Sequence, residues 1–379
     1  MDEPIRILQC GMTNNYGGVE TFIMSIYKNI DRKKIQFDFL TTHDGVIAYE
    51  DEIKQMGGRI FKIEYSSREN FVKHFFSLKK FFEEHGSEFK AVHMNKCYPN
   101  YTLPLKYAKR SGIENRIVHS HCSKSMIDDT GISKRIKSKM DKYKITKRAT
   151  KLLACSDEAG KYLFENNDFE IIPNGIDMSL FKFNNEIRNK LREQLKITDK
   201  YVLGMVGRLA YPKNVMFSLK ILKELCRHDK SYVLLLVGDG NERREIEDYI
   251  CASSLQNNVI ILGKKENVES YYQAMDLFLF PSEYEGFGIS MVEAQTSGLR
   301  CIASDRVPIT TKITEVVEYL SIDNGVEEWI RKIEEARKTK IDRLKQYEKC
   351  IKTCYNIDNS IDAIMDIYEK GGTMYGKKI

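Results

Sequence analysis

Two glutamates, Glu285 and Glu293, stand on either side of a glycine-bracketed aromatic residue in the sequence Glu-Gly-Phe-Gly-Ile-Ser-Met-Val-Glu. The apolar segment before them, Leu277–Phe280, is typical of a short buried strand that Pro281 ends. The segment 289–295 is compatible with a helix. A strand, a tight glycine turn and a helix start aim backbone N–H groups at an anion, and carboxylates accept hydrogen bonds from hydroxyl groups. The pattern therefore favours a phosphorylated, polyhydroxylated ligand over two solvated surface acids.

Two cations form the second candidate group. Arg208 directly follows Gly207 at the end of an apolar run, and Lys213 follows Pro212 five residues further on. Arginine offers a bidentate fork to phosphate oxygens and lysine offers a point charge, so the pair suits a diphosphate. Two unrelated surface cations are the ordinary alternative. Gly207 and Pro212 favour a loop with a defined conformation that binds a ligand over this alternative.

Near the amino terminus, Gly17 and Gly18 follow the first predicted strand and precede a helical segment. Glycines permit close approach of the backbone to a ligand at the carboxyl edge of a sheet, although Gly-Gly also simply turns a chain. The spacing is not G-x-G-x-x-G, so a dinucleotide site is poorly supported.

His119 and His121 lie on one face of a predicted strand end, at the spacing of a metal pair. The sequence offers no evident third ligand, and no Asp-x-Asp occurs anywhere in the chain, so we expect no metal. At least one of the two histidines is expected to be structural.

The elements that must position these residues alternate between short apolar runs and amphipathic stretches, the pattern of parallel sheets flanked by helices. An α/β fold with two doubly wound domains is therefore predicted. The strands expected in the first half are Arg6–Cys10, Gln36–Thr41, Arg59–Glu64, Ala91–Met94, Arg116–His121 and Lys151–Ser156. Those expected in the second half are Tyr201–Val206, Tyr232–Val237, Val259–Leu262, Leu277–Phe280, Arg300–Ala303 and Glu318–Ile322. We expect domains at 1–182 and 183–355, followed by a helical tail, 356–379, with apolar residues at helical spacing.

The length of 379 residues suits two domains, and 42% hydrophobic with 30% charged residues is typical of a globular protein. No run reaches the roughly 18–20 apolar residues that a membrane span needs, and the amino terminus lacks the layout of a secretion signal. The nine cysteines, mostly scattered and odd in number, indicate reduced thiols in a cytoplasmic protein rather than a disulfide scaffold or a zinc site.

Positive charge is concentrated in one stretch. The net charge is only +6, but residues 101–150 hold thirteen lysines and arginines against four acids. The densest part, residues 131–151, carries Ile136, Met140 and Tyr143 at helical spacing. Such a segment can lie on an anionic membrane surface, and a solvated helix face is the equally ordinary alternative. No stacking motif or known module accompanies the charge, so nucleic acid is not expected.

At the run Pro281–Gly288, read with the second Glu at 293, the chain resembles glycosyltransferase family 4, whose signature has this pattern. The Gly-Arg-Leu run at 207–209, the Lys213-Asn214 pair, Gly17-Gly18 and Pro-Asn-Gly-Ile-Asp at 173–177 extend the resemblance over essentially the whole chain. It implies a GT-B fold: two Rossmann-like domains facing a cleft, with the last helix crossing back to the first domain. It also suggests bacterial exopolysaccharide or capsule enzymes.

The resemblance implies roles for these residues. Arg208 and Lys213 would hold the donor diphosphate, Glu285 would contact the transferred sugar and Glu293 the ribose. His121, with His119 as second choice, would face the donor sugar. The other donor-site residues implied are Gly17, Gly18, Gly207, Gly238, Lys265, Val268, Phe287, Gly288 and Ile289.

The activity implied is a retaining, metal-independent hexosyl transfer from a nucleotide-diphosphate sugar, with UDP expected, to a hydroxyl acceptor, with no cofactor. The basic stretch favours a lipid-linked glycan as acceptor, at the inner face of the cell membrane. A soluble acceptor, such as a polyol phosphate polymer, a protein hydroxyl or a small metabolite, stays open. A GT-B nucleotide-sugar epimerase and a catalytically silent binding partner are the alternatives from other classes.

Overall fold

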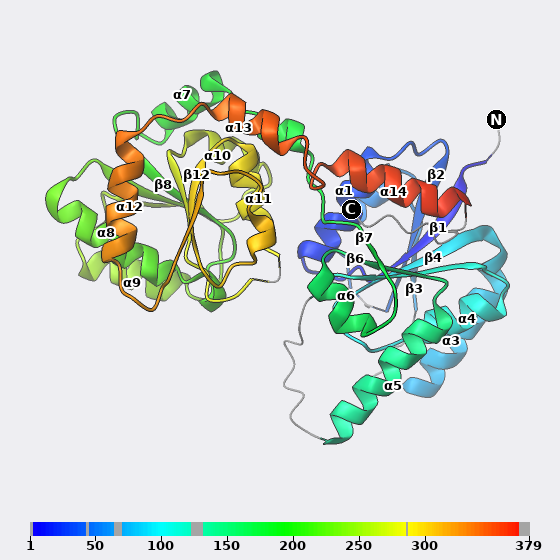
Figure 1. The fold of residues 1–379 in the computed structure, drawn as a ribbon. Helices are drawn as coiled ribbons and strands as arrows, with labels where there is room; N and C mark the ends of the chain where they lie inside the picture. The colour runs from blue at the N-terminus through cyan, green and yellow to red at the C-terminus, as the bar shows by residue number, and fades with distance from the viewer. Residues whose placement is uncertain (1–2, 43–44, 64–69, 123–131, 286, 371–379) are drawn as a thin grey trace. The chain divides into compact units, whose positions relative to one another are not determined.

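The computed structural model describes residues 3–42, 45–63, 70–122, 132–285 and 287–370. The chain divides into two compact units (Figure 1). The first comprises residues 1–175 together with 357–379, and the second comprises residues 176–356. No described helix is long and apolar enough to cross a membrane.

Within the described residues, the first unit is built on a seven-stranded parallel sheet with the order β3-β2-β1-β4-β5-β6-β7. Its strands are β1 (Ile5–Cys10), β2 (Ile35–Thr41), β3 (Ile60–Lys62), β4 (Phe89–Lys96), β5 (Asn115–Ser120), β6 (Lys151–Ala154) and β7 (Glu170–Ile171). Its helices are α1 (Gly18–Asn29), α2 (Glu50–Gln55), α3 (Phe71–His85), α4 (Leu103–Arg110), α5 (Ile132–Arg148), α6 (Asp157–Phe164) and α14 (Ile357–Lys370).

The second unit has, in its described part, a six-stranded parallel sheet with the order β10-β9-β8-β11-β12-β13. Its strands are β8 (Tyr201–Val206), β9 (Tyr232–Val237), β10 (Val259–Ile261), β11 (Leu277–Phe280), β12 (Arg300–Ser304) and β13 (Val317–Leu320). Its helices are α7 (Asn185–Gln194), α8 (Val215–His228), α9 (Arg243–Ala252), α10 (Val268–Ala274), α11 (Ile289–Thr296), α12 (Glu327–Lys338) and α13 (Arg343–Cys350).

The predicted α/β class with two parallel sheets is confirmed. Every predicted strand is present with its ends within two residues, apart from Glu64, which lies outside the described residues. The short strand β7 was not predicted, because two residues carry no periodicity. Both strand orders reverse direction beside the first strand of the sheet, which is the doubly wound arrangement.

Alternating side chains along each strand of the second unit enter two separate cores. Val202 and Val206 of β8 pack in the cluster that α10 and α11 cover, whereas Leu203 and Met205 pack in the cluster beneath α8, α9 and α12. Because both faces are covered, the strands are almost continuously apolar, as buried parallel strands are. Polar groups can therefore gather on the loops at the carboxyl ends of the strands, which the two cores do not cover.

Helix α14, the last of the described helices, belongs to the core of the first unit. Ile364, Ile367 and Tyr368 are buried there with residues of α1 and of β2. Figure 1 shows α14 beside α1. The Tyr368 hydroxyl accepts from Gln9 Nε2 at 2.9 Å and lies 2.6 Å from His93 Nδ1. The apolar tail that the sequence predicts therefore docks on the first sheet, 359 residues from Gln9 along the chain. Residues 371–379 of the predicted tail lie outside the described residues.

Candidate active site

Lys213 and Glu285 form an ion pair at the carboxyl edge of the second sheet, with Nζ 2.6 Å from Oε1. Lys213 ends a single 3-10 turn that follows β8, and Glu285 lies on the loop that follows β11. These two strands are hydrogen-bonded neighbours in the sheet, so their loops meet. The backbone N–H of Glu283 also donates to the carbonyl of Pro212 at 2.9 Å.

The pair is held from two further sides. The hydroxyl of Ser282 donates to the same Glu285 oxygen at 2.8 Å. The Lys213 ammonium lies 4.7 Å from the centre of the Phe280 ring. Only 21% of the Lys213 side chain and 10% of the Glu285 side chain are exposed. Partial burial strengthens the attraction between the two charges relative to a pair in water.

Glycines bring the backbone close at this edge. A Cβ built on Gly238 would lie 1.8 Å from the carbonyl oxygen of Gly207, so no other residue fits without movement of the chain. Gly288 precedes α11 in the left-handed conformation, with φ of 88°. A Cβ there would lie 3.2 Å from Phe280. Gly286, the first glycine of the turn, lies outside the described residues.

Glu293 lies in α11 and is half-buried. The hydroxyl of Tyr272, from α10, donates to Glu293 Oε2 at 2.6 Å. Burial raises the pKa of the Glu293 carboxyl, while the hydrogen bond from Tyr272 and the nearby Lys213 ammonium oppose the rise. A half-buried carboxylate with one oxygen held in this way can present the other oxygen to a ligand hydroxyl.

The remaining predicted residues of the second unit surround this edge. Arg208 is exposed and makes no side-chain hydrogen bond or ion pair among the described residues. Lys265 is half-buried on the loop after β10, and Val268 begins α10. Phe287 packs against Tyr355, with ring centres 5.2 Å apart. Ile289 begins α11.

In the first unit, Gly17 caps α1 and Gly18 is its first residue, directly after the loop that leaves β1. A Cβ on Gly17 would meet Glu20 Oε2 at 2.9 Å, whereas Gly18 has open space around it. Gly18 is exposed, so its backbone is accessible to a ligand at the carboxyl edge of this sheet.

His121 follows β5 and is 9% exposed. Its Nε2 lies 3.0 Å from Asn95 Oδ1, and its ring centre lies 4.2 Å from that of His119. His119 stacks in turn on His93, 5.6 Å away. Burial lowers the pKa of His121 to about 4 and that of His93 to about 3, so both rings are neutral near pH 7. His119 is fully buried, whereas His121 has the greater access to solvent.

Sequence reasoning missed several polar partners of these residues. Tyr272 and Asn95 carry no motif of their own, because their contacts come from other elements of the fold. Ser282 could have been found, since it precedes Glu285 by three residues on one short loop. The cation–π contact of Phe280 required the structure, because its ring belongs to a strand read only as core.

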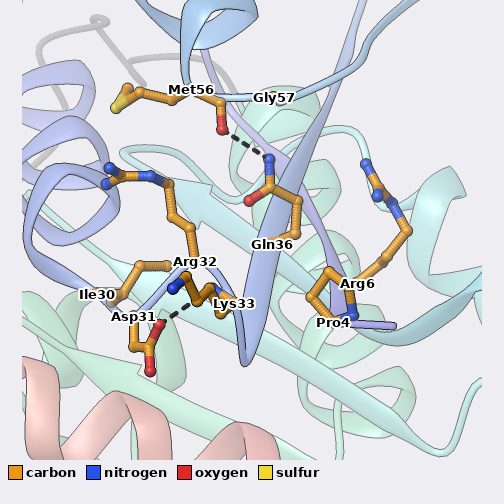
Figure 2. A pocket seen from close by; sticks show the side chains of 9 residues that line it. All are labelled: Pro4, Arg6, Ile30, Asp31, Arg32, Lys33, Gln36, Met56 and Gly57. Carbon is orange, nitrogen blue, oxygen red and sulfur yellow. Dashed lines mark hydrogen bonds between the residues drawn. The ribbon is translucent and has the colours of Figure 1, made fainter. Parts of the chain in front are cut away.

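A pocket of about 590 Å³ lies at the opposite, amino-terminal edge of the first sheet (Figure 2). Arg6, Arg32 and Gln36 line it, but Arg6 is engaged with Asp38 and Gln36 donates to the carbonyl of Met56. No predicted site residue lines this pocket. The polar groups gathered by the motifs are at the carboxyl edges instead.

Comparison with known proteins agrees with this arrangement. The pattern of Glycosyltransferase Family 4 matches residues 16–180, and that of Glycosyl transferases group 1 matches residues 187–356. EpsF of Bacillus subtilis (strain 168), named a glycosyltransferase, is 32% identical over 375 residues, covering 96% of each chain.

A more distant relative and a solved structure extend the comparison. The UDP-Gal:alpha-D-GlcNAc-diphosphoundecaprenol alpha-1,3-galactosyltransferase of Escherichia coli is 27% identical over 207 residues, covering 52% of this chain and 53% of its own. Anabaena HepE, solved in complex with UDP, shares the fold with a TM-score of 0.74 at 18% identity, covering 97% of this chain and 100% of its own. The predicted GT-B fold is thereby confirmed. The protein is a glycosyltransferase and belongs to glycosyltransferase family 4.

Proposed function

We propose that the protein transfers a hexose, with retention of anomeric configuration, from a UDP-linked sugar to a hydroxyl of a lipid-linked glycan in bacterial surface-polysaccharide biosynthesis. The observation that carries the proposal is the ion pair between Lys213 and Glu285 at the carboxyl edge of the second sheet, with Arg208 exposed on the same loop as Lys213. The HepE structure with UDP supports the choice of donor, and the capsular polysaccharide biosynthesis glycosyltransferase CapM of Staphylococcus aureus, 29% identical over 155 residues, supports the choice of pathway.

The residues suit a leaving diphosphate. As the bond between the sugar and the diphosphate breaks, negative charge develops on the leaving oxygen, and the cations of Arg208 and Lys213 would stabilise it. The same leaving oxygen would take the proton of the acceptor hydroxyl on the face where the new bond forms. Glu285 would orient the sugar through its hydroxyls, and Glu293 would accept from the ribose.

His121 would support the donor sugar as a neutral group. Its ring is uncharged near pH 7 because burial lowers its pKa to about 4. It can therefore donate or accept one hydrogen bond without adding charge to the site. Fixed cations on the diphosphate would make a divalent metal unnecessary, so we expect transfer to continue in excess EDTA.

The acceptor proposal rests on α5. Its exposed apolar residues Ile136, Met140 and Tyr143 are 55%, 53% and 64% accessible and stand at helical spacing. Lys137 and Lys139 are exposed between them. An anionic membrane face complements both features, and the Escherichia coli relative is named for a diphosphoundecaprenol acceptor. We place the enzyme at the cytoplasmic face of the membrane. Residue 131 of the predicted segment lies outside the described residues.

The test is an NMR assay of a panel of UDP-sugars with and without a diphosphoundecaprenol-linked sugar. Product that forms only with the lipid acceptor, with the anomeric configuration of the donor, is the expected result. An inverted anomer would overturn retention. Conversion of the donor alone into an isomeric UDP-sugar would identify an epimerase, and transfer only to soluble acceptors would overturn the lipid assignment.

A further inference from the structure

A chain of buried hydrogen bonds joins helix α14 to His121 across the first sheet. The Tyr368 hydroxyl, from α14, lies 2.6 Å from His93 Nδ1 and accepts from Gln9 Nε2 at 2.9 Å. Gln9 Oε1 accepts from Asn95 Nδ2 at 3.1 Å, and Asn95 Oδ1 lies 3.0 Å from His121 Nε2. All five residues are buried. The chain thus has a histidine at each end, and its other members are two amides and a hydroxyl.

The strands place these side chains on one face of the first sheet. In register, Gln9 of β1 pairs with His93 of β4, and Asn95 lies two residues further along β4. Alternate residues of a strand share a face of the sheet, so both β4 side chains lie on the face of Ala91. Ala91 packs in the same apolar cluster as Tyr368 of α14. The polar chain is therefore enclosed between the sheet and this helix.

The chain runs in one of two directions when every link holds one hydrogen. Burial lowers the pKa of His121 to about 4 and that of His93 to about 3, so near pH 7 each ring is neutral and carries a single N–H. If His121 donates at Nε2, each amide and the hydroxyl donate onward, and His93 accepts at Nδ1. If the links are reversed, His93 donates at Nδ1 and His121 accepts at Nε2. The two rings are therefore both Nε2–H tautomers or both Nδ1–H tautomers.

The backbone carbonyl of Cys10 selects between the two directions. Asn95 Nδ2 donates to this oxygen at 3.4 Å and to Gln9 Oε1 at 3.1 Å, so both hydrogens of the amide have acceptors. In the reversed direction, the carbonyl oxygen of Asn95 would face the carbonyl oxygen of Cys10, and one N–H of the amide would lose its acceptor. A carbonyl can only accept, and a buried N–H without an acceptor is costly. The direction in which His121 donates at Nε2 is therefore favoured.

We propose that Asn95 is a positioning residue that holds His121 as the Nε2–H tautomer, so that Nδ1 is the ring nitrogen that can accept from a ligand hydroxyl. The tautomer follows from contacts within the first unit alone. Its bearing on transfer rests on the proposed function, in which His121 faces the donor sugar. Under that function the sugar hydroxyl supplies the hydrogen of the contact and His121 supplies the lone pair.

The test labels the histidine rings of the full-length protein with nitrogen-15 and identifies the protonated nitrogen of each ring by long-range proton–nitrogen NMR near pH 7.5. His121→Gln and His93→Gln assign the two signals among the seven histidines of the chain. In the unsubstituted protein we expect both rings to be protonated at Nε2 and not at Nδ1.

Three variants locate the group that sets the tautomer. Asn95→Leu should give a mixture of both tautomers at His121. Tyr368→Phe removes the hydroxyl that donates to His93, so it should give a mixture at His93 and leave His121 unchanged. Tyr27→Phe is the matched control, because it removes another buried tyrosine hydroxyl of the first unit that accepts from a glutamine. It should leave both rings unchanged.

Three outcomes would overturn the proposal. One is a His121 ring protonated at Nδ1 in the unsubstituted protein. The second is a folded Asn95→Leu variant in which His121 is still entirely the Nε2–H tautomer. The third is a mixture at His121 in Tyr368→Phe, since this would show that Tyr368 and not Asn95 controls the ring. The first and third measurements decide the question even if Asn95→Leu does not fold.

Addition of the panel of UDP-sugars separates this inference from the proposed function. The sugar nucleotide that serves as donor should shift the Nδ1 signal of His121 while Nε2 stays protonated, and UDP alone should not. If no UDP-sugar shifts this signal although the free protein has the expected tautomer, His121 does not face the donor sugar and the proposed function loses that contact. The assignment of Asn95 would then still stand.

Discussion

The ammonium of Lys213 and the carboxylate of Glu285 neutralise each other at 2.6 Å across two neighbouring strand ends. The pair holds both charges in a partly buried position without leaving either one alone. A diphosphate would compete for the ammonium and so free the carboxylate for sugar hydroxyls. Under the proposed function, the ion pair would thus couple binding of the phosphates to binding of the sugar.

Replacement of Lys213 by alanine is expected to lower kcat by roughly 10²–10³-fold, the usual loss for one group that stabilises developing negative charge. The change also leaves the Glu285 carboxylate, 10% exposed, without its counterion, so the free energy of unfolding should fall by about 1–3 kcal/mol. Steady-state kinetics and urea unfolding measure the two effects.

Arg208→Ala should separate the loss of turnover from the loss of stability, because the Arg208 side chain is exposed and unpaired among the described residues. We expect a similar loss of kcat with unchanged unfolding. Lys349→Ala, which breaks an exposed ion pair with Glu315 in the same unit, should change neither quantity. Near-normal turnover in both site variants would refute their assignment to the diphosphate.

Tyr272→Phe removes the hydroxyl that donates to Glu293 at 2.6 Å. That hydrogen bond opposes the effect of burial, so its loss should raise the pKa of Glu293 further. The acidic limb of the kcat/KM profile should therefore move to higher pH, with little change above it. A uniform loss of kcat/KM at every pH would instead indicate a general packing defect.

The stability of the first unit should decrease in acid because of its buried histidines. Burial lowers the pKa of His93 to about 3 and that of His121 to about 4, so the unfolded chain binds protons that the folded unit does not. The free energy of unfolding is highest above about pH 6.5, the pKa of histidine in the unfolded chain. It decreases as the pH falls towards the lower pKa values of these rings in the folded protein. Each of the two rings should make the free energy of unfolding at pH 5 roughly 2 kcal/mol lower than at pH 7.

Urea unfolding between pH 7.5 and 5 tests this expectation. His93→Gln keeps a polar partner for Tyr368 and should reduce the loss on acidification by roughly 2 kcal/mol. His228→Gln, at an exposed position in the second unit, should leave the pH dependence unchanged. Identical slopes for all three proteins would exclude the buried rings as the cause.

Lys137→Gln with Lys139→Gln should weaken binding to vesicles of anionic lipid by about 2 kcal/mol, roughly 30-fold, because each lysine near the surface contributes about 1 kcal/mol. Co-sedimentation at low salt measures it. Lys338→Gln with Lys340→Gln, an exposed pair with the same spacing in the second unit, is the matched control. Equal losses in both double variants would show that only net charge matters.

The sequence predicted the fold well because the strands of both sheets are buried on two faces and therefore apolar throughout. The proximity of Lys213 and Glu285 could also be predicted, since both follow strands that end in glycine or proline signals. Parallel neighbours put such ends at one edge, which makes their proximity predictable.

Other contacts could not be predicted, because they depend on register and side-chain direction. Asn95 lies beside His121 because β4 pairs with β5, and nothing in the sequence states that pairing. No sequence motif marks Tyr272, whose hydroxyl reaches Glu293 from another helix.

The return of α14 to the first sheet has a consequence for synthesis on the ribosome. Ile364 and Tyr368, buried against the first sheet, are made after the whole second unit, so the amino-terminal unit cannot complete its core before α14 has been synthesised. The second unit, residues 176–356, is complete earlier, so the usual order in which the amino-terminal domain matures first is reversed here. A nascent chain stalled after residue 356 would carry a finished second unit and an unfinished first one.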